Sequence, residues 1–342
     1  MPRPRRAASR PATTTGDGEP RWSRREARCF HLDQLPVTGA GDPVAVPPLL
    51  EGATARLVSH DPDSGAVTWL AELPAGYRHK DPAADATVEL FLLEGDIALD
   101  GDRAGAGGYV CLPQGCGGGK LASKGGARAL VFWNPALPSF PEPYHAKRIV
   151  RTWQIPLQVR TPGSVGQLYR PLRLPDTVGE TFNGGPGGFL RMTVITPGMT
   201  SPSQHLHRTC WEEGFVLSGD IFVGERGLMG PGSYIAFPQG LWHAVLASQT
   251  GCVLLVHTDA PMDFPWELRD HPAGPAMVED YMDAQPWGRP ATHVPWDETP
   301  QRRFLDSPAV RAWAKKAPVW EPDVERGSAS RFRGSWRRSR DS

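Results

Sequence analysis

The stretch FLLEGDI at residues 91–97 returns as FVLSGDI at residues 215–221, an offset of 124 residues. Two later pairs follow at an offset of 125: GYVCLPQG at 108–115 with SYIAFPQG at 233–240, and LASKGGARALVF at 121–132 with LASQTGCVLLVH at 246–257. Three matched segments in one order and at nearly one spacing indicate an internal duplication. This duplication sets the architecture of the chain.

Each copy has the alternation of β-branched, aromatic and small residues that is typical of strands. Turns are signalled within the repeats at Gly95-Asp96 and Gly219-Asp220. The 38 glycines and 36 prolines exceed a fifth of the 342 residues, against an average of about 12%. Each copy is therefore predicted to be an antiparallel β-barrel or sandwich.

Composition limits the kinds of partner and compartment. The 37 basic residues balance the 37 acidic ones, which gives no reason to expect nucleic acid or an anionic membrane as a main partner. Arg5 and Arg6 precede no apolar run, and no stretch has the length of a membrane span. Five cysteines without a Cys-x-x-Cys pair indicate reduced thiols, so a cytoplasmic protein is predicted.

The second copy carries a set of possible metal ligands. It contains Gly198, then His205-x-His207-x4-Glu212-x6-Gly219, and then Gly232-x5-Pro238-x-Gly240-x2-His243. Residues two apart on a β-strand point to the same side, so His205 and His207 present neighbouring imidazoles. Alternation back from Gly219 places Glu212 and Val216 on one face of a strand and Glu213 on the other. It leaves open which face is inward.

These two strings resemble the two motifs of the cupin superfamily, and the chain looks most similar to bicupins with ChrR-type cupin domains. The resemblance covers roughly residues 54–262. The chain departs from the pattern in one extra residue between Gly198 and His205 and in Ala247, where the family has Asn. The resemblance implies an all-β fold of two tandem cupin domains, each a jelly-roll β-barrel. The arginine-rich ends, also rich in Ser, Gly and Pro, predict disordered basic tails, and a short C-terminal helix is expected as well.

The cupin spacing from His207 reaches Glu212 rather than Glu213, so the resemblance selects Glu212 as the inward carboxylate. The implied ligands are His205, His207, Glu212 and His243. Three imidazoles and one carboxylate suit one divalent transition metal, with Fe(II) favoured and Mn, Ni, Co or Zn as alternatives.

The first copy lacks these ligands. The offset places Asp81, Ala83, Val88 and Gly118 where the second copy has its four ligands. His79 and Glu89 lie nearby, but alternation puts Glu89 on the face equivalent to that of Glu213, which should point away. A degenerate first barrel without a metal is therefore predicted.

Five further residues are candidates for the site. Trp211, Val216, Phe237 and Trp242 lie close to the ligands in sequence and are predicted to line a substrate pocket. His257 stands where the first copy has Phe132. It is a candidate catalytic residue, either as a support to a ligand or as an acid or base.

The resemblance favours a non-haem metal dioxygenase or other oxygenase acting on a small aromatic or enolisable molecule. One alternative is a Zn- or Mn-dependent isomerase, cyclase or hydrolase, and another is a non-catalytic sensor or binding protein for a metal or small molecule. The expected partner is a small-molecule substrate, with no membrane and no nucleic acid. A homodimer is compatible with the sequence.

Helix signals occur late in the chain, with Ser307 as N-cap, Pro308 at the first helical position and Ala309–Lys316 after it. The predicted organisation is a basic tail (1–28), a degenerate cupin barrel (29–135), a Pro-rich linker with edge strands (136–180), a metal-binding cupin barrel (181–262), a C-terminal extension with a short helix (263–325) and a second basic tail (326–342).

Overall fold

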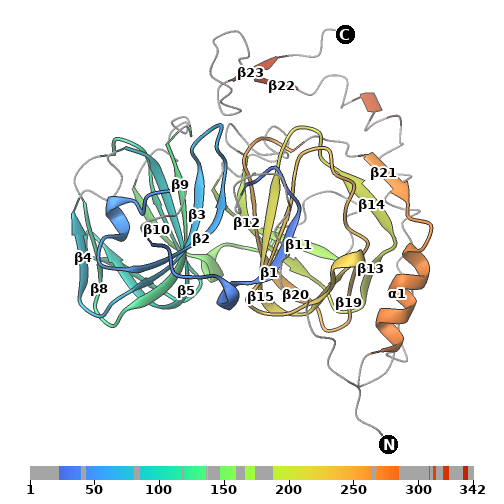
Figure 1. The fold of residues 1–342 in the computed structure, drawn as a ribbon, viewed down its shortest axis with the longest axis horizontal. Coiled ribbons are helices and arrows are strands. Elements are labelled where there is room, and N and C mark those ends of the chain that lie inside the picture. The colour runs from blue at the N-terminus through green and yellow to red at the C-terminus, as the bar shows by residue number, and fades with distance from the viewer. Residues whose placement is uncertain are drawn as a thin grey trace, which may run out of the picture.

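The protein was analysed as a computed structural model. The structure describes residues 23–39, 44–80, 85–116, 119–135, 137, 147–158, 166–173, 188–262, 267–284, 308, 311–312, 319–322 and 334–337. Figure 1 shows two β-barrels side by side, with the earlier strands in the left barrel and the later strands in the right one. The predicted fold class, all-β with two tandem barrels, is confirmed.

The first barrel is formed by a nine-stranded sheet in the order β10-β7-β5-β9-β3-β2, to which β4, β6 and β8 are attached. Its strands are β2 (Thr54–His60), β3 (Val67–Leu73), β4 (Tyr77–Lys80), β5 (Thr87–Leu99), β6 (Asp102–Gly105), β7 (Gly108–Leu112), β8 (Lys120–Ser123), β9 (Ala127–Asn134) and β10 (Arg148–Arg151).

The second barrel combines a six-stranded sheet, β1-β18-β15-β20-β12-β11, with the sheets β13-β19-β16-β17 and β14-β21. Its strands are β1 (Arg28–His31), β11 (Gln167–Arg173), β12 (Leu190–Ile195), β13 (Met199–Ser201), β14 (Ser203–Leu206), β15 (Glu212–Gly219), β16 (Ile221–Val223), β17 (Gly227–Met229), β18 (Ser233–Phe237), β19 (Leu246–Ser248), β20 (Cys252–Thr258) and β21 (Glu267–Asp270). Short 3-10 turns are η1 (Leu32–Gln34), η2 (Pro48–Leu50), η3 (Thr152–Gln154) and η4 (Gly224–Arg226).

The duplication read from the sequence is repeated in the strand register. Val88 pairs with Leu112 in the first barrel, and Glu212 pairs with Phe237 in the second. The register shift between Leu92 and Glu94 returns between Val216 and Ser218. Because bulge positions are specific features of a strand pair, the two barrels share one plan down to single residues.

The barrels exchange strands. β1 precedes the strands of the first barrel in sequence but pairs with β18 of the second. β10 lies in the segment predicted to lead into the second barrel but pairs with β7 of the first. Figure 1 shows β1 lying at the second barrel. Strand pairing therefore ties the two barrels together at both of these edges.

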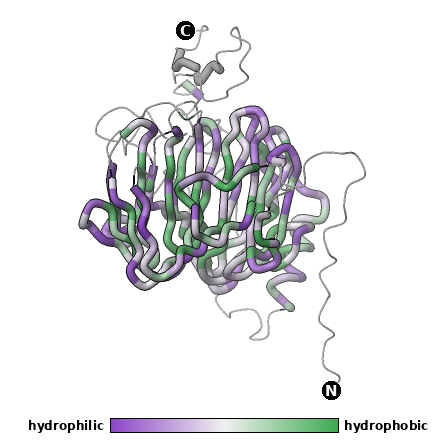
Figure 2. Tube along the Cα trace, turned by 60° about the vertical axis from the view of Figure 1, so that its left-hand side comes forward, coloured by the Kyte–Doolittle hydropathy of each residue, from purple (hydrophilic) through white to green (hydrophobic). Residues whose placement is uncertain are grey.

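One apolar core runs through the first barrel and across the junction. It includes Trp69 and Phe132 of the first barrel together with Trp211, Phe215 and Leu255 of the second. The rings of Phe132 and Phe215 lie 6.1 Å apart in an edge-to-face arrangement. Figure 2 shows hydrophobic residues concentrated along the strands and hydrophilic ones at many of the turns.

The C-terminal extension covers one flank of the second barrel (Figure 1). It contributes β21 and the helix α1 (Gly274–Asp283), which packs against β19 through Val278, Tyr281 and Met282. The sequence did not predict α1. Of the predicted helix at 309–316, only residues 311 and 312 are described, and both are helical, as is residue 308.

Both predicted basic tails fall largely outside the described residues. One part of the second is described: β23 (Gly334–Arg337) pairs with β22 (Val319–Pro322). Among the described residues, no helix has both the length and the apolar character needed to cross a bilayer. All five cysteines are free thiols.

Candidate metal centre

His205 and His243 face each other across a backbone pair. His205 lies on β14, and His243 lies in the loop before β19. The amide of each donates to the carbonyl of the other at 2.9 Å, which is the arrangement of a directly opposed antiparallel pair. Their ring centroids are 4.4 Å apart, so local strand pairing alone brings two imidazoles together.

The same pairing positions His207. The Gly240 amide donates to the His207 carbonyl at 2.7 Å, next to the turn in which the Leu241 amide bonds to the Pro238 carbonyl. Gly240 has φ +77°, a conformation that glycine adopts at little cost. The Pro-Gln-Gly sequence therefore fixes the approach of His243 to the other two histidines.

Glu212 completes the group as the first residue of β15. Its Oε2 lies 3.6 Å from His207 Nε2 and 3.5 Å from His243 Nε2. One potential ligand atom from each of the four residues lies within 4.8 Å of all the others. One ion bonded at about 2.1 Å holds two donors at most about 4.2 Å apart, so a contraction of less than about 1 Å would close the set on an ion.

The protonation pattern suits metal binding. His243 Nδ1 lies 2.8 Å from the Leu241 carbonyl, so this nitrogen carries the proton and Nε2 keeps its lone pair toward the group. His243 Nε2 is buried and makes no hydrogen bond to any described residue. The ring also stacks on Phe237, with centroids 4.1 Å apart. With Nδ1 held by the backbone, Nε2 is the nitrogen turned toward the other three donors, as a metal ligand requires.

Electrostatics keep Glu212 ionised. Burial acts to raise the pKa of its carboxyl, but the adjacent His207 and His243 outweigh burial and hold the pKa well below its usual value.

Ala244, which follows His243, has φ +72°, a left-handed conformation that costs a non-glycine residue about 1 kcal/mol. Such strain is found where surrounding structure holds a functional side chain in place.

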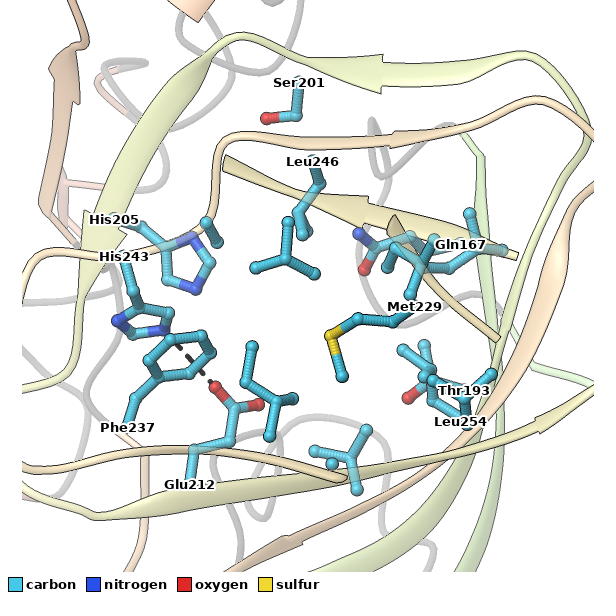
Figure 3. Close-up of a pocket in the computed structure, with 18 of the residues that line it drawn as sticks. Gln167, Thr193, Ser201, His205, Glu212, Met229, Phe237, His243, Leu246 and Leu254 are labelled. Carbon is cyan, nitrogen blue, oxygen red and sulfur yellow. Dashed lines mark ion pairs between the residues drawn. The ribbon is translucent and has the colours of Figure 1, made fainter. Parts of the chain in front are cut away.

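The four residues lie at one end of a cavity of about 160 Å³ inside the second barrel. Figure 3 shows His205, His243, Phe237 and Glu212 on one side of it. Much of the remaining wall is aliphatic and includes Ile195, Val216, Ile221, Met229, Ile235 and Leu254. A largely apolar wall strengthens electrostatic interactions at the polar end.

Of the four predicted wall residues, Val216 and Phe237 line the cavity. Trp211 and Trp242 are not among the residues that line it. Trp211 lies on the side of the barrel junction, where the Arg24 guanidinium stacks 4.2 Å from its ring. The Arg269 guanidinium lies over the Trp242 ring, 4.4 Å from the ring centroid. Closeness in sequence to a ligand did not ensure a place in the cavity.

His257 also lies outside the cavity, so the structure gives no support to its role as a catalytic residue. It is the register partner of Glu213 on the opposite face of the sheet from Glu212. Its Nδ1 lies 2.8 Å from Glu213 Oε1. Burial lowers the pKa of His257 to about 4, so the neutral ring donates to the carboxylate.

Glu213 is fully buried between the barrels and accepts hydrogen bonds from both. It accepts hydrogen bonds from Ser59 and Thr68 of the first barrel and from Tyr234 of the second. Four donors from two barrels satisfy its charge, including His257. This residue therefore links the barrels and is not available to a metal.

The equivalent residue Glu89 points the same way, as alternation predicted. The Tyr109 hydroxyl donates to it at 2.5 Å, and Arg173 of the second barrel lies 3.2 Å away. Val88, at the place of Glu212, is fully buried and has no donor atom. Among the described residues, the only cluster with metal-binding potential is that of the second barrel. Asp81, Ala83 and Gly118 lie outside the described residues.

Several wall residues were missed by the sequence analysis, among them Gln167, Arg191, Thr193 and Leu268. Arg191, Thr193 and Ile195 alternate along β12, so period-2 spacing could have grouped them on one face. Nothing in their order shows that this face meets the ligands. Leu268 reaches the cavity because β21 pairs with β14 and sets it opposite His205.

Comparison with solved structures supports the fold. A candidate dioxygenase from Nostoc punctiforme shares 20% identity at a TM-score of 0.56, with 72% of this chain and 88% of that chain covered. A candidate glyoxylate-induced protein from Pseudomonas aeruginosa shares 13% identity at a TM-score of 0.50, covering 66% and 84%. No protein-family model matches the chain, and no curated protein matches it. At such identities the likeness shows the cupin fold alone.

Proposed function

We propose that the second barrel binds one divalent transition metal, with Fe(II) favoured, and that the protein is an oxygenase for a small aromatic or enolisable molecule. The observation that carries the proposal is the convergence of His205, His207, Glu212 and His243 within 4.8 Å at the end of an apolar cavity. When bound, the ion supplies a Lewis-acid and redox centre with positions left open to small molecules.

The protein residues hold and insulate this centre. His205 and His243 are fixed by their shared backbone pair, and His243 is kept in one tautomer by the Leu241 carbonyl. Phe237 packs flat against the His243 ring. Fixed ligands with an enclosed apolar wall exclude bulk water from the reacting groups.

The cavity limits the size of the substrate. An engineered apolar cavity of about 150 Å³ accepts benzene, and this cavity measures about 160 Å³. A one-ring molecule or a diketone of comparable size would therefore occupy it. The name of the Nostoc punctiforme protein, a candidate dioxygenase with the same fold, agrees with this reaction class.

The first test is metal analysis of protein purified without a histidine tag. We expect close to one transition-metal ion per chain, bound in the second barrel and not in the first. His243→Ala should lose this ion, because the three donors that remain bind far more weakly. Full metal retention in His243→Ala would overturn the ligand assignment.

The second test follows O2 consumption after separate reconstitution with Fe(II), Mn(II), Ni(II) and Zn(II). The substrates are a panel of diketones, catechols, hydroxyketones and thiols. We expect turnover with a redox-active ion and none with Zn(II). Equal turnover with Zn(II), or conversion without O2, would assign the site to an isomerase, cyclase or hydrolase. Binding without conversion would indicate a sensor.

A further inference from the structure

The end of the cavity that faces the ligands carries polar groups of its own. Gln167 on β11 and Thr193 on β12 both line the cavity. Figure 3 shows them across the cavity from His205, His243 and Glu212, with their polar atoms turned toward the interior. Met229 and Leu254 also line the cavity, and Figure 3 shows Met229 between the two polar ends. The cavity is thus polar at both ends and apolar in the middle.

Thr193 has an unused hydroxyl. Its side chain is 5% exposed, and Oγ1 is buried without a hydrogen-bond partner among the described residues. A buried hydroxyl that makes no hydrogen bond destabilises the fold, whereas valine would fill the same space without that loss. A hydroxyl of this kind at a cavity wall indicates a ligand group that completes its hydrogen bonding.

Gln167 is oriented by its neighbour. The Tyr169 hydroxyl donates to Gln167 Oε1, which leaves the amide N–H groups as the donors on the cavity side. Tyr169 is also the register partner of Thr193 across β11 and β12. The two strands therefore hold an N–H donor and an O–H donor at the same end of the cavity.

We propose that Thr193 and Gln167 form the specificity end of the substrate site and bind an acceptor oxygen. The substrate class that fits is a small bifunctional molecule, with metal-binding oxygens at one end and a carbonyl or carboxylate at the other. This assignment rests on the proposed metal site for the first end. Arg191 also lines the cavity, two residues from Thr193 on β12, and adds positive charge near the acceptor.

The test compares two probes that share a catechol head and differ at the far end, 3,4-dihydroxybenzaldehyde and 4-methylcatechol. Both are titrated without O2 into the Ni(II)-loaded protein. The aldehyde should bind about fivefold to tenfold more tightly, the gain from one or two buried hydrogen bonds. Thr193→Val and Gln167→Leu should each lower this preference severalfold.

Thr193→Ser is the matched control, because it keeps the hydroxyl and should keep the preference. Bound Ni(II) per chain should be the same in all variants, since neither residue is a ligand. A wild-type protein without the preference, or a preference unchanged in Thr193→Val, would overturn the proposal. Failure of both probes to bind would overturn it as well.

The proposed oxygenase activity can fail separately. Absence of O2 uptake with Fe(II), beside an intact preference for the aldehyde, would reject the reaction and keep the specificity end. If Ni(II) does not bind, the comparison is repeated in metal-free protein with benzaldehyde and toluene, which need no metal. The same dependence on Thr193 is expected there, and its absence would overturn the proposal.

Discussion

At the scale of single residues, adjacent glutamates have opposite environments. Glu212 points into the cavity of the second barrel, whereas Glu213 points out of that barrel and into the junction with the first. Both are ionised, since neighbouring groups hold the pKa of each carboxyl below its usual value although burial acts to raise it. Period-2 alternation places the two carboxylates on opposite faces, and what each face meets makes one a candidate ligand and the other a structural carboxylate.

The pair offers a matched test of the ligand assignment. Glu212→Gln should lower metal affinity by at least about 100-fold, because the neutral amide is a far weaker ligand than a carboxylate. Glu213→Gln should keep the metal but lower the free energy of unfolding by about 1–3 kcal/mol, since an amide cannot accept from all four donors. Metal analysis and urea unfolding measure the two effects. The reverse result would show that Glu213 is the ligand.

At the scale of elements, helix α1 shows why one helix was missed and another was predicted. α1 has no side-chain N-cap, and Ala273 occupies that position. The predicted helix after Ser307 has a strong local start signal. α1 instead depends on a tertiary contact, since Tyr281 and Met282 pack on β19. Helices of about ten residues are marginal without such packing.

Tyr281 should be the main anchor of α1. Its hydroxyl accepts from the Gln249 amide at 3.0 Å and donates to Asp220, and its ring stacks on Phe222. Tyr281→Phe keeps the ring and removes the hydroxyl, so we expect a loss of about 1–2 kcal/mol in the free energy of unfolding. Metal content should not change. Urea unfolding of the two proteins provides the measurement, and equal midpoints would contradict this anchoring role.

At the scale of the whole molecule, the two barrels form one structural unit. They exchange β1 and β10, share one apolar core cluster and meet through two buried carboxylates, Glu89 and Glu213. The first barrel therefore supplies packing and hydrogen bonds to the back of the sheet that carries Glu212.

The shared core should make thermal unfolding of the two barrels cooperative. We expect one cooperative transition, with tryptophan fluorescence and circular dichroism changing together, because the barrels share one apolar core and β1 joins the second barrel from ahead of the first. Calorimetric and van't Hoff enthalpies should then agree. Two separate transitions would show that the barrels are independently stable.

The junction should also make stability depend on pH. The pKa of His257 is about 4 in the folded protein because of burial, and about 6.5 in an unfolded chain. Between these values the unfolded state binds more protons, so the free energy of unfolding falls as the pH is lowered through this window. The loss is at most about 3 kcal/mol.

His257→Phe introduces the residue type that the first barrel has at the equivalent position, Phe132. This variant should be less stable near neutral pH, because Glu213 loses a donor, but its stability should fall less between about pH 6.5 and pH 4. Urea unfolding of metal-free wild type and variant at several pH values tests this, because the titration of the ligand histidines is common to both proteins and cancels in the difference. An unchanged slope would show that another group is responsible.

The sequence by itself determined the duplication, the two-barrel fold and the three histidines that converge, while the choice of Glu212 over Glu213 came from the resemblance to cupins. These features depend on local spacing: an offset of 124 residues, histidines two apart, and a Pro-Gln-Gly turn before His243. Spacing of this kind fixes which side chains share a face of a strand, and paired strands carry that information into space.

Only the tertiary structure decided what each face meets. β15 is buried on both sides, so its sequence does not distinguish the cavity from the junction. For this reason His257 and Trp211 were expected near the site and lie at the junction instead, while Thr193 and Gln167 were not foreseen. Their positions depend on which distant strands pair and on how the second barrel closes around its interior.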